Sequence, residues 1–121
     1  MKHTLKFDDK NQILVQTING VFTTDETKQI GNKYVELFEG RQYRQLIVDL
    51  RNAGKMENRE TRSITNVMLN EAKITEVAFV GAAAPQRMIA KVLMKLGSLN
   101  ADANFVKDMD DAINWLEKRR K

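Results

Sequence analysis

The stretch QLIVDL, residues 45–50, is a nearly continuous apolar run without the alternation of a half-buried strand. Such a run is typical of a strand that is buried on both faces of a parallel sheet. Residues 76–81, EVAFVG, repeat this pattern later in the chain. The two runs therefore predict central strands of a sheet that is covered on both faces.

The N-terminal residues predict a β-hairpin. Residues 4–8 and 12–18 are short runs rich in β-branched and aromatic side chains, and residues 9–11 between them have the composition of a turn. Asn19-Gly20 predicts a further turn after the second strand. His3, the only histidine, precedes the first strand, and we expect it to be an exposed edge residue.

Helical periodicity recurs between and after these strands. Thr23 and Glu26 have the spacing of a capping box at the start of the first helix. Asp108 is the expected N-cap of the last helix, whose first turn is acidic and whose last turn is basic. A short strand near residues 103–107 precedes it. The predicted helices cover residues 24–39, 59–72, 85–96 and the segment after Asp108.

The resulting element order is β-β-α-β-α-β-α-β-α, which predicts an α/β fold with a mixed sheet, a parallel centre and covering helices. We expect residues 1–121 to form a single domain. Ligands of such sheets usually bind at the carboxyl ends of the strands. The junction at 51–62 and the loop GAAAPQR at 81–87 follow two of these ends, and they are predicted to lie side by side.

Composition narrows the functional classes. The 121 residues include no cysteine, which favours a reducing, cytoplasmic location and excludes disulfides and thiolate chemistry. No stretch approaches the roughly 18 apolar residues of a membrane span, and the first residues lack the apolar core of a signal peptide. We therefore expect a soluble protein that is not integral to a membrane.

The charge distribution argues against a nucleic-acid partner. The net charge of +4 is accounted for by the last four residues, Lys118 to Lys121, so the remaining chain is neutral. A terminal basic run is usually a solvated tail, and no aromatic-rich strand accompanies it. Nucleic acid is therefore not an expected partner.

The sequence contains few combinations of residues that could form a catalytic site. A single histidine cannot supply a histidine-rich metal centre, and no dinucleotide or phosphate-loop fingerprint is present. Asp49, near the end of a buried strand, is expected to accept hydrogen bonds from junction amides rather than act as a general base. We therefore predict a non-enzymatic protein without a cofactor or metal.

The element order, together with LIVDL at 46–50, VAFVG at 77–81 and DMDDAINWL at 108–116, resembles the STAS-like domains of the SpoIIAA-like group, relatives of the bacterial anti-sigma factor antagonists. The resemblance covers nearly the whole chain, and it implies a regulatory, protein-binding module of the same fold. Its motifs are patterns of core and turn residues rather than chemistry.

The resemblance fails at the switch site. Antagonists that respond to phosphorylation carry a Met-Asp-Ser-Ser-Gly-like segment, which falls here on MENRE, residues 56–60. Asn58 and Arg59 have no hydroxyl group that could be phosphorylated. The resemblance therefore implies that this segment lacks the phosphorylation switch of the antagonists. Thr61 and Ser63 lie nearby, but about one helical turn further along.

Basic residues flank the two predicted loops. Arg51, Lys55, Arg59 and Arg62 follow one strand end, and Arg87 and Lys91 recur with helical spacing after the next. If they converge, the edge suits a protein partner or a small anionic or lipidic ligand. A solvated helix face, partly neutralised by nearby glutamates, is the alternative interpretation. The candidate binding residues are Asn58, Arg59, Arg62, Arg87 and Lys91.

Two further alternatives stay open. A carrier of a lipidic or anionic small molecule would need a cavity, which we expect to be lined by Met88, Val92, Phe105 and Met109. A homodimer would pair through the hairpin edge or through the margin around Trp115.

Overall fold

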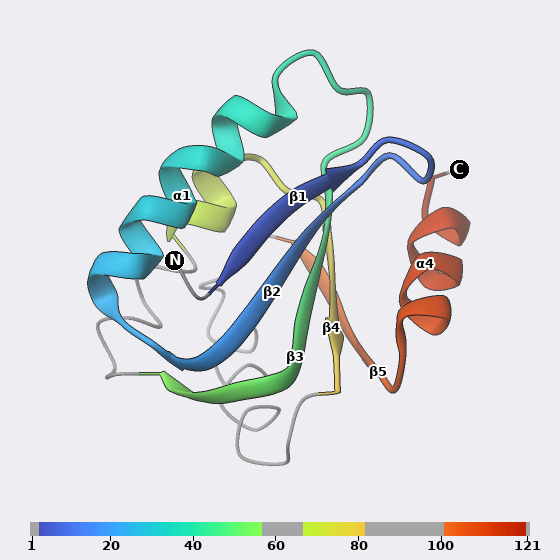
Figure 1. Cartoon of the computed structure of the whole chain (residues 1–121). Helices are drawn as coiled ribbons and strands as arrows, with labels where there is room; N and C mark the ends of the chain where they lie inside the picture. Colours follow the sequence, from blue (N-terminus) through green and yellow to red (C-terminus); the bar gives the residue numbers. More distant parts are fainter. Residues whose placement is uncertain (1–2, 57–66, 82–100, 121) are drawn as a thin grey trace.

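The computed structural model describes residues 3–56, 67–81 and 101–120, and Figure 1 shows them as a mixed sheet with helices on both faces. One five-stranded sheet has the order β1-β2-β3-β4-β5, in which β1 is antiparallel to β2 and the remaining neighbours are parallel. The predicted fold class is therefore confirmed. The strands are β1 Thr4–Asp8, β2 Ile13–Phe22, β3 Gln45–Met56, β4 Glu76–Val80 and β5 Asp102–Val106, and the helices are α1 Thr24–Phe38 and α4 Met109–Lys118.

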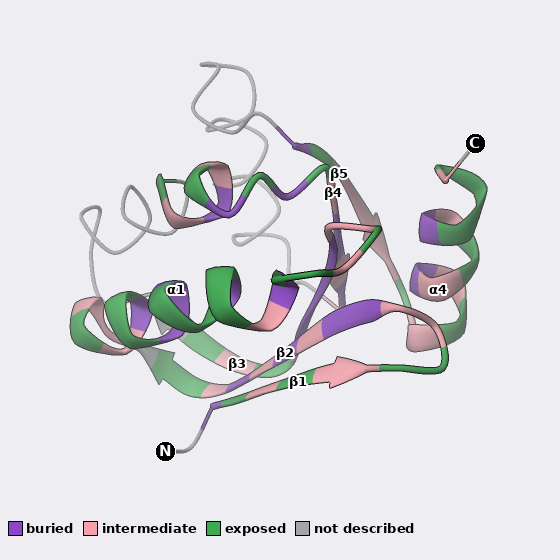
Figure 2. Ribbon diagram, turned by 90° about the horizontal axis from the view of Figure 1, so that it is seen from above, coloured by how far each residue is buried: buried purple, intermediate pink, exposed green. Residues whose placement is uncertain are grey.

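Residues 67–71 are helical and match the end of the second predicted helix. The earlier part of that helix and the helix predicted over 85–96 lie outside the described residues. In Figure 2, α1 and the helical segment at 67–71 lie on one face of the sheet and α4 lies on the other.

Residues 45–49 of the central strand β3 are buried on both faces, as the apolar run predicts. Leu46 and Val48 belong to the larger core cluster, which includes α1 residues such as Tyr34. Ile47 points to the opposite face and joins the smaller cluster, which includes Leu116 of α4. Side chains alternate between the two faces of a strand, so this one segment supplies both cores.

Helix α1 begins where the capping-box spacing predicts. The Glu26 N–H donates to the Thr23 hydroxyl at 3.2 Å, and the Thr23 N–H donates to the Glu26 carboxylate at 3.1 Å. Gly31 is buried on the inward side, where an added Cβ would lie 2.4 Å from the side chain of Met68. The missing side chain therefore lets α1 approach the neighbouring helical segment closely.

Helix α4 also begins at its predicted cap, because the Asp111 N–H donates to the Asp108 side chain at 2.8 Å. Ala112 and Leu116 are fully buried against the sheet. The acidic first turn and Lys118 in the last turn complement the helix dipole.

Two predicted strand ends are wrong. Asn19-Gly20 is not a turn but part of β2, and β3 continues past the apolar run to Met56. The two strands stay paired in parallel across this extension, with register shifts after Thr17 and after Gly20. Gly20 has φ +75, and an added Cβ on Gly54 would lie 3.0 Å from the backbone of Gly20. Asn19-Gly20 has the composition of a turn but lies in a bulged part of the β2–β3 pair. A β-bulge, like a turn, needs unusual backbone angles, which glycine adopts easily.

The prediction of a solvated basic C-terminal tail is also wrong for Arg120. Its Nε–H donates to Gln45 Oε1 at 2.8 Å, and its terminal nitrogen donates to the carbonyls of Asn11 and Gln12 at 2.6 and 3.1 Å. The guanidinium also stacks 4.2 Å from the ring centre of Tyr43. The end of α4 is therefore fastened to the β1–β2 turn and to the start of β3.

A buried polar pair lies inside the larger core. Tyr34 is 3% exposed, and its hydroxyl donates to Gln16 Oε1 across the α1–β2 contact. Burial raises the pKa of Tyr34 well above its ordinary value, with the hydrogen bond to Gln16 opposing part of that effect. The pair is neutral and satisfied only while the tyrosine keeps its proton.

We expect Tyr34→Phe to lower the free energy of unfolding by about 1–3 kcal/mol, because it leaves the buried Gln16 carbonyl without its donor. Replacing both partners, Gln16→Leu with Tyr34→Phe, should recover most of the loss. Denaturant unfolding at neutral pH measures both. Equal stability of Tyr34→Phe and wild type would contradict the buried bond.

The same pair predicts an alkaline effect. Above about pH 10 the unfolded chain releases the tyrosine proton while the folded chain retains it, so stability falls as the pH rises. Tyr34→Phe should therefore lose less stability than wild type between neutral and alkaline solution.

Candidate functional site

An ion pair between Asp49 and Arg51 lies within β3, where the pairing of β3 with β4 ends. Asp49 is buried at 7% exposure, and its carboxylate accepts hydrogen bonds from the Arg51 Nε at 2.9 Å and the terminal nitrogen at 2.7 Å. It also accepts the Arg51 backbone N–H at 3.1 Å. These bonds from Arg51 outweigh burial and hold the pKa of Asp49 below its ordinary value.

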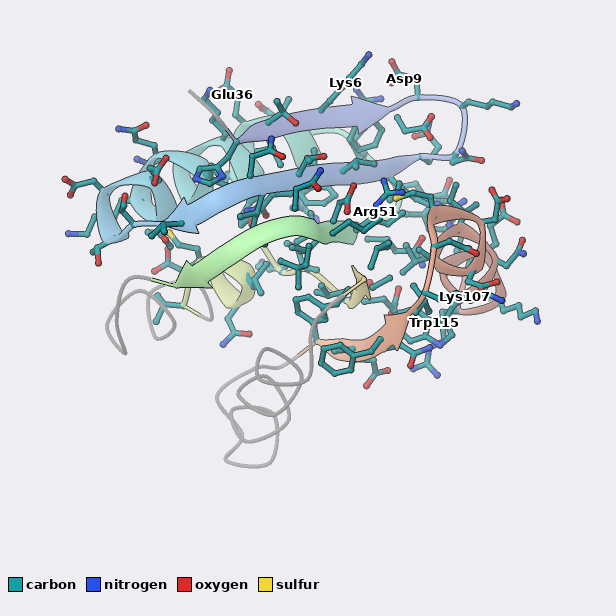
Figure 3. All side chains as sticks on the ribbon, turned by 60° about the horizontal axis from the view of Figure 1, so that its bottom comes forward. Lys6, Asp9, Glu36, Arg51, Lys107 and Trp115 are labelled. Atoms are coloured by element: carbon teal, nitrogen blue, oxygen red, sulfur yellow. The ribbon has the colours of Figure 1, made fainter. Side chains whose placement is uncertain are left out.

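Arg51 also contacts the end of β4. Gly81 has φ +69, and an added Cβ there would lie 2.5 Å from Arg51 Cγ. Its Asp49 partner, together with a weaker contribution from Asp108 at the start of α4, raises the pKa of Arg51. Figure 3 shows Arg51 on the side of β3 that faces α4. The Arg51 side chain thus lies beside the end of β4, where the pairing of β3 with β4 ends.

The hydrogen bonding predicted for Asp49 is confirmed, because its carboxylate accepts the backbone N–H of Arg51, the first residue of the predicted junction. The junction itself differs from the prediction, since residues 51–56 extend β3 rather than forming a loop. Arg51 therefore stands on a strand. The candidate binding residues of the flanking segments lie outside the described residues: Asn58, Arg59, Arg62, Arg87 and Lys91.

The prediction that His3 is exposed is wrong. His3 is 1% exposed; its Nδ1 accepts the Asn19 backbone N–H at 3.0 Å, and its Nε2 lies 2.9 Å from a Glu26 oxygen. Burial raises the pKa of Glu26, but hydrogen bonds from Thr23 and His3 bring it below its ordinary value. Both ring nitrogens are engaged, so His3 fastens the N-terminus to β2 and α1. Sequence reasoning missed this role because neither partner is near His3 in the chain.

The cavity expected for a carrier is divided by the sheet. Phe105 stacks on Phe79 with ring centres 5.2 Å apart, and Phe79 belongs to the core on the α1 face. Met109 packs in the other cluster, on the α4 face. Phe105 and Met109 therefore cannot line one cavity. The other two predicted lining residues, Met88 and Val92, lie outside the described residues.

Within residues 3–56, 67–81 and 101–120, no group of three or more potential metal-ligating side chains lies together. No helix in these same ranges is long and apolar enough to cross a membrane. In the described part of this edge, the charged group held in place is the guanidinium of Arg51, which pairs with the buried carboxylate of Asp49. The two parallel hydrogen bonds of this charged pair fix the orientation of the guanidinium.

The geometry matches that of SpoIIAA-like proteins. An uncharacterised protein with a SpoIIAA-like fold from Shewanella loihica superposes with a TM-score of 0.70 at 15% identity, covering 94% of this chain and 91% of that one. The unphosphorylated anti-sigma factor antagonist SpoIIAA gives a TM-score of 0.67 at 12% identity, with 98% and 97% covered. The phosphorylated Bacillus cell fate determinant SpoIIAA gives 0.65 at 14%, with 94% and 98% covered.

These similarities show that the protein has the SpoIIAA-like fold. A comparison with curated protein sequences finds no significant match. The chain belongs to the family described as domain of unknown function DUF7793, whose sequence profile matches residues 8–120.

The Asp49–Arg51 pair predicts a stability change in acid. The native pKa of Asp49 is lowered, so its contribution is present at neutral pH and is lost as the pH falls through that native value. We expect Asp49→Asn to be less stable than wild type at neutral pH, and we expect the difference to narrow below about pH 4. Thermal unfolding across this range measures both.

Asp9→Asn is the matched control. Asp9 also pairs with an arginine, Arg41, but its side chain is 77% exposed, so the substitution should change stability little. An Asp49→Asn curve that follows the wild-type curve at every pH would contradict the assigned pair.

Proposed function

We propose that the protein is a non-enzymatic regulatory module that binds a protein partner at the carboxyl edge of its sheet, formed by the segment at 51–62 and the loop at 81–87. The observation that carries this proposal is the SpoIIAA-like fold over nearly the whole chain, since two of the similar structures are an anti-sigma factor antagonist and a cell fate determinant. A cytoplasmic site of action is part of the proposal.

The composition of the edge supports the choice of surface. Asp49 already holds the Arg51 side chain in place within β3, so a further contact to Arg51 would cost little additional entropy. The neighbouring segments contribute Asn58, Arg59, Arg62, Arg87 and Lys91 from the sequence. An acidic patch on a partner protein would complement such an edge.

Regulation by phosphorylation at the position used by the antagonists is not part of the proposed function. When their phosphorylated segment is laid along this chain without a gap from Asp49-Leu50, it falls on MENRE, residues 56–60, which contain no hydroxyl group. Partner binding should therefore survive when the two nearby hydroxyls are removed together, as Thr61→Ala with Ser63→Ala.

The test is affinity capture from cells of the source organism with tagged wild-type protein and charge-reversal variants. A partner of this edge should be retained by wild type and lost with Arg59→Glu and with Arg87→Glu, because each reversal repels an acidic surface. Circular dichroism and thermal unfolding verify that each variant is folded.

Lys118→Glu provides the control, since Lys118 is exposed in the last turn of α4, at the opposite end of the strands. A partner that both edge variants retain as well as wild type does would contradict this surface. A partner lost equally with Lys118→Glu would indicate dependence on overall charge, which would also contradict it.

A further inference from the structure

A surface hollow of about 330 Å³ lies at the opposite, amino-terminal end of the parallel strands. Its walls come from the segment that leads into β3, the start of β4 and the end of α4. Figure 1 shows the C-terminus beside the β1–β2 turn at this end of the sheet. The lining residues are Gln42, Tyr43, Arg44, Gln45, Thr75, Glu76, Arg119 and Arg120.

Two of the three arginines in this hollow are held by neutral groups. Arg44 donates to the carbonyl of Ala72 at 2.9 Å and lies 5.8 Å from the ring centre of Phe38. Arg120 is bonded to Gln45 and to two backbone carbonyls, and it stacks on Tyr43. In the described part of the chain, neither guanidinium lies within ion-pair distance of a carboxylate.

Other arginines in the described residues do form ion pairs with carboxylates. Arg51 and Arg41 each pair with an aspartate. Arg119, the third arginine of the hollow, pairs with Asp102. Hydrogen bonds to carbonyls fix the position of a guanidinium but leave its charge in place, so the charges of Arg44 and Arg120 remain available to a ligand.

The acidic side chain in the lining is Glu76, and one of its carboxylate oxygens already accepts hydrogen bonds from the protein. Its Oε1 accepts from Gln45 Nε2 at 2.9 Å and from the Thr75 hydroxyl at 2.8 Å. Three arginines against one glutamate leave the lining positive, and the charge of Asp102 beside Arg119 does not fully cancel this excess. The volume lies at the small end of the range for ligand sites.

We propose that this hollow binds a small anion that carries carboxylate or phosphate groups, with Arg44 and Arg120 as the fixed contacts and the more exposed Arg119 as the adjustable one. Planar guanidinium groups match both anion types through paired hydrogen bonds. The site lies at the other end of the strands from the proposed partner surface. It therefore stands or fails independently of partner binding.

The test is a titration of the full chain with inorganic phosphate and, separately, with citrate, at constant ionic strength. Trp115 is the only tryptophan, and the Arg119 guanidinium lies 5.7 Å from its ring centre, so tryptophan fluorescence reports on contacts to Arg119. The proposal expects a saturable change at millimolar concentrations of at least one anion. The two titrations distinguish a phosphate ligand from a carboxylate ligand.

Gln42→Glu places a negative charge in the exposed part of the lining and should weaken binding about five- to tenfold. Gln29→Glu on α1 adds the same charge at an exposed position outside the lining and should leave affinity unchanged. Arg44→Gln gives a second, independent loss if Gln42→Glu folds poorly. No saturable binding of either anion, or equal weakening by Gln29→Glu and Gln42→Glu, would overturn the proposal.

Discussion

The burial of residues 45–49 of β3 on both faces of the sheet is the constraint on which the rest of the structure depends. Leu46 and Val48 supply the core shared with α1, and Ile47 supplies the core shared with α4. Burial of each such side chain contributes roughly 1.5–3 kcal/mol, so exposing either face of β3 would remove a large part of a domain's marginal stability. The helices on the two faces are therefore held by one short segment.

Buried polar side chains at both ends of residues 45–49 stabilise the position of β3 in the sheet. Gln45 is 1% exposed at the start, where its amide donates to Glu76 and to the carbonyl of Leu116 at 2.9 and 2.8 Å. Asp49 near the other end is satisfied by Arg51. Buried polar groups that are fully bonded specify register, because a shifted strand would leave them unpaired. The two proposed binding sites begin at these two ends.

Much of this fold could be predicted from local sequence signals. The apolar run at 45–50, the Thr23–Glu26 capping box and the Asp108 cap depend on near neighbours, and the structure has all of them. The failures concern distant partners. Asn19-Gly20 has turn composition but pairs with β3 through a bulged register. His3 is buried by residues of β2 and α1, which only the tertiary fold brings to it.

The residues of the two proposed sites were harder to predict than the fold, because several of their partners are also distant in sequence. Asp49 could be identified because a carboxylate at the end of an apolar strand needs donors. Arg120 could not, since its acceptors, Gln45 and the carbonyls of Asn11 and Gln12, are far away in sequence. A terminal basic run has the same composition whether it is solvated or fastened. Its role follows from the three-dimensional structure alone.

Native-state hydrogen exchange of the backbone amides tests the central position of β3 most directly. The structure predicts that amides of residues 46–49, paired with both β2 and β4, exchange only through global unfolding, with a free energy equal to that from denaturant unfolding. Amides of the edge strand β1 should exchange through smaller openings. Exchange at 46–49 as fast as that in β1 would contradict a core organised around β3.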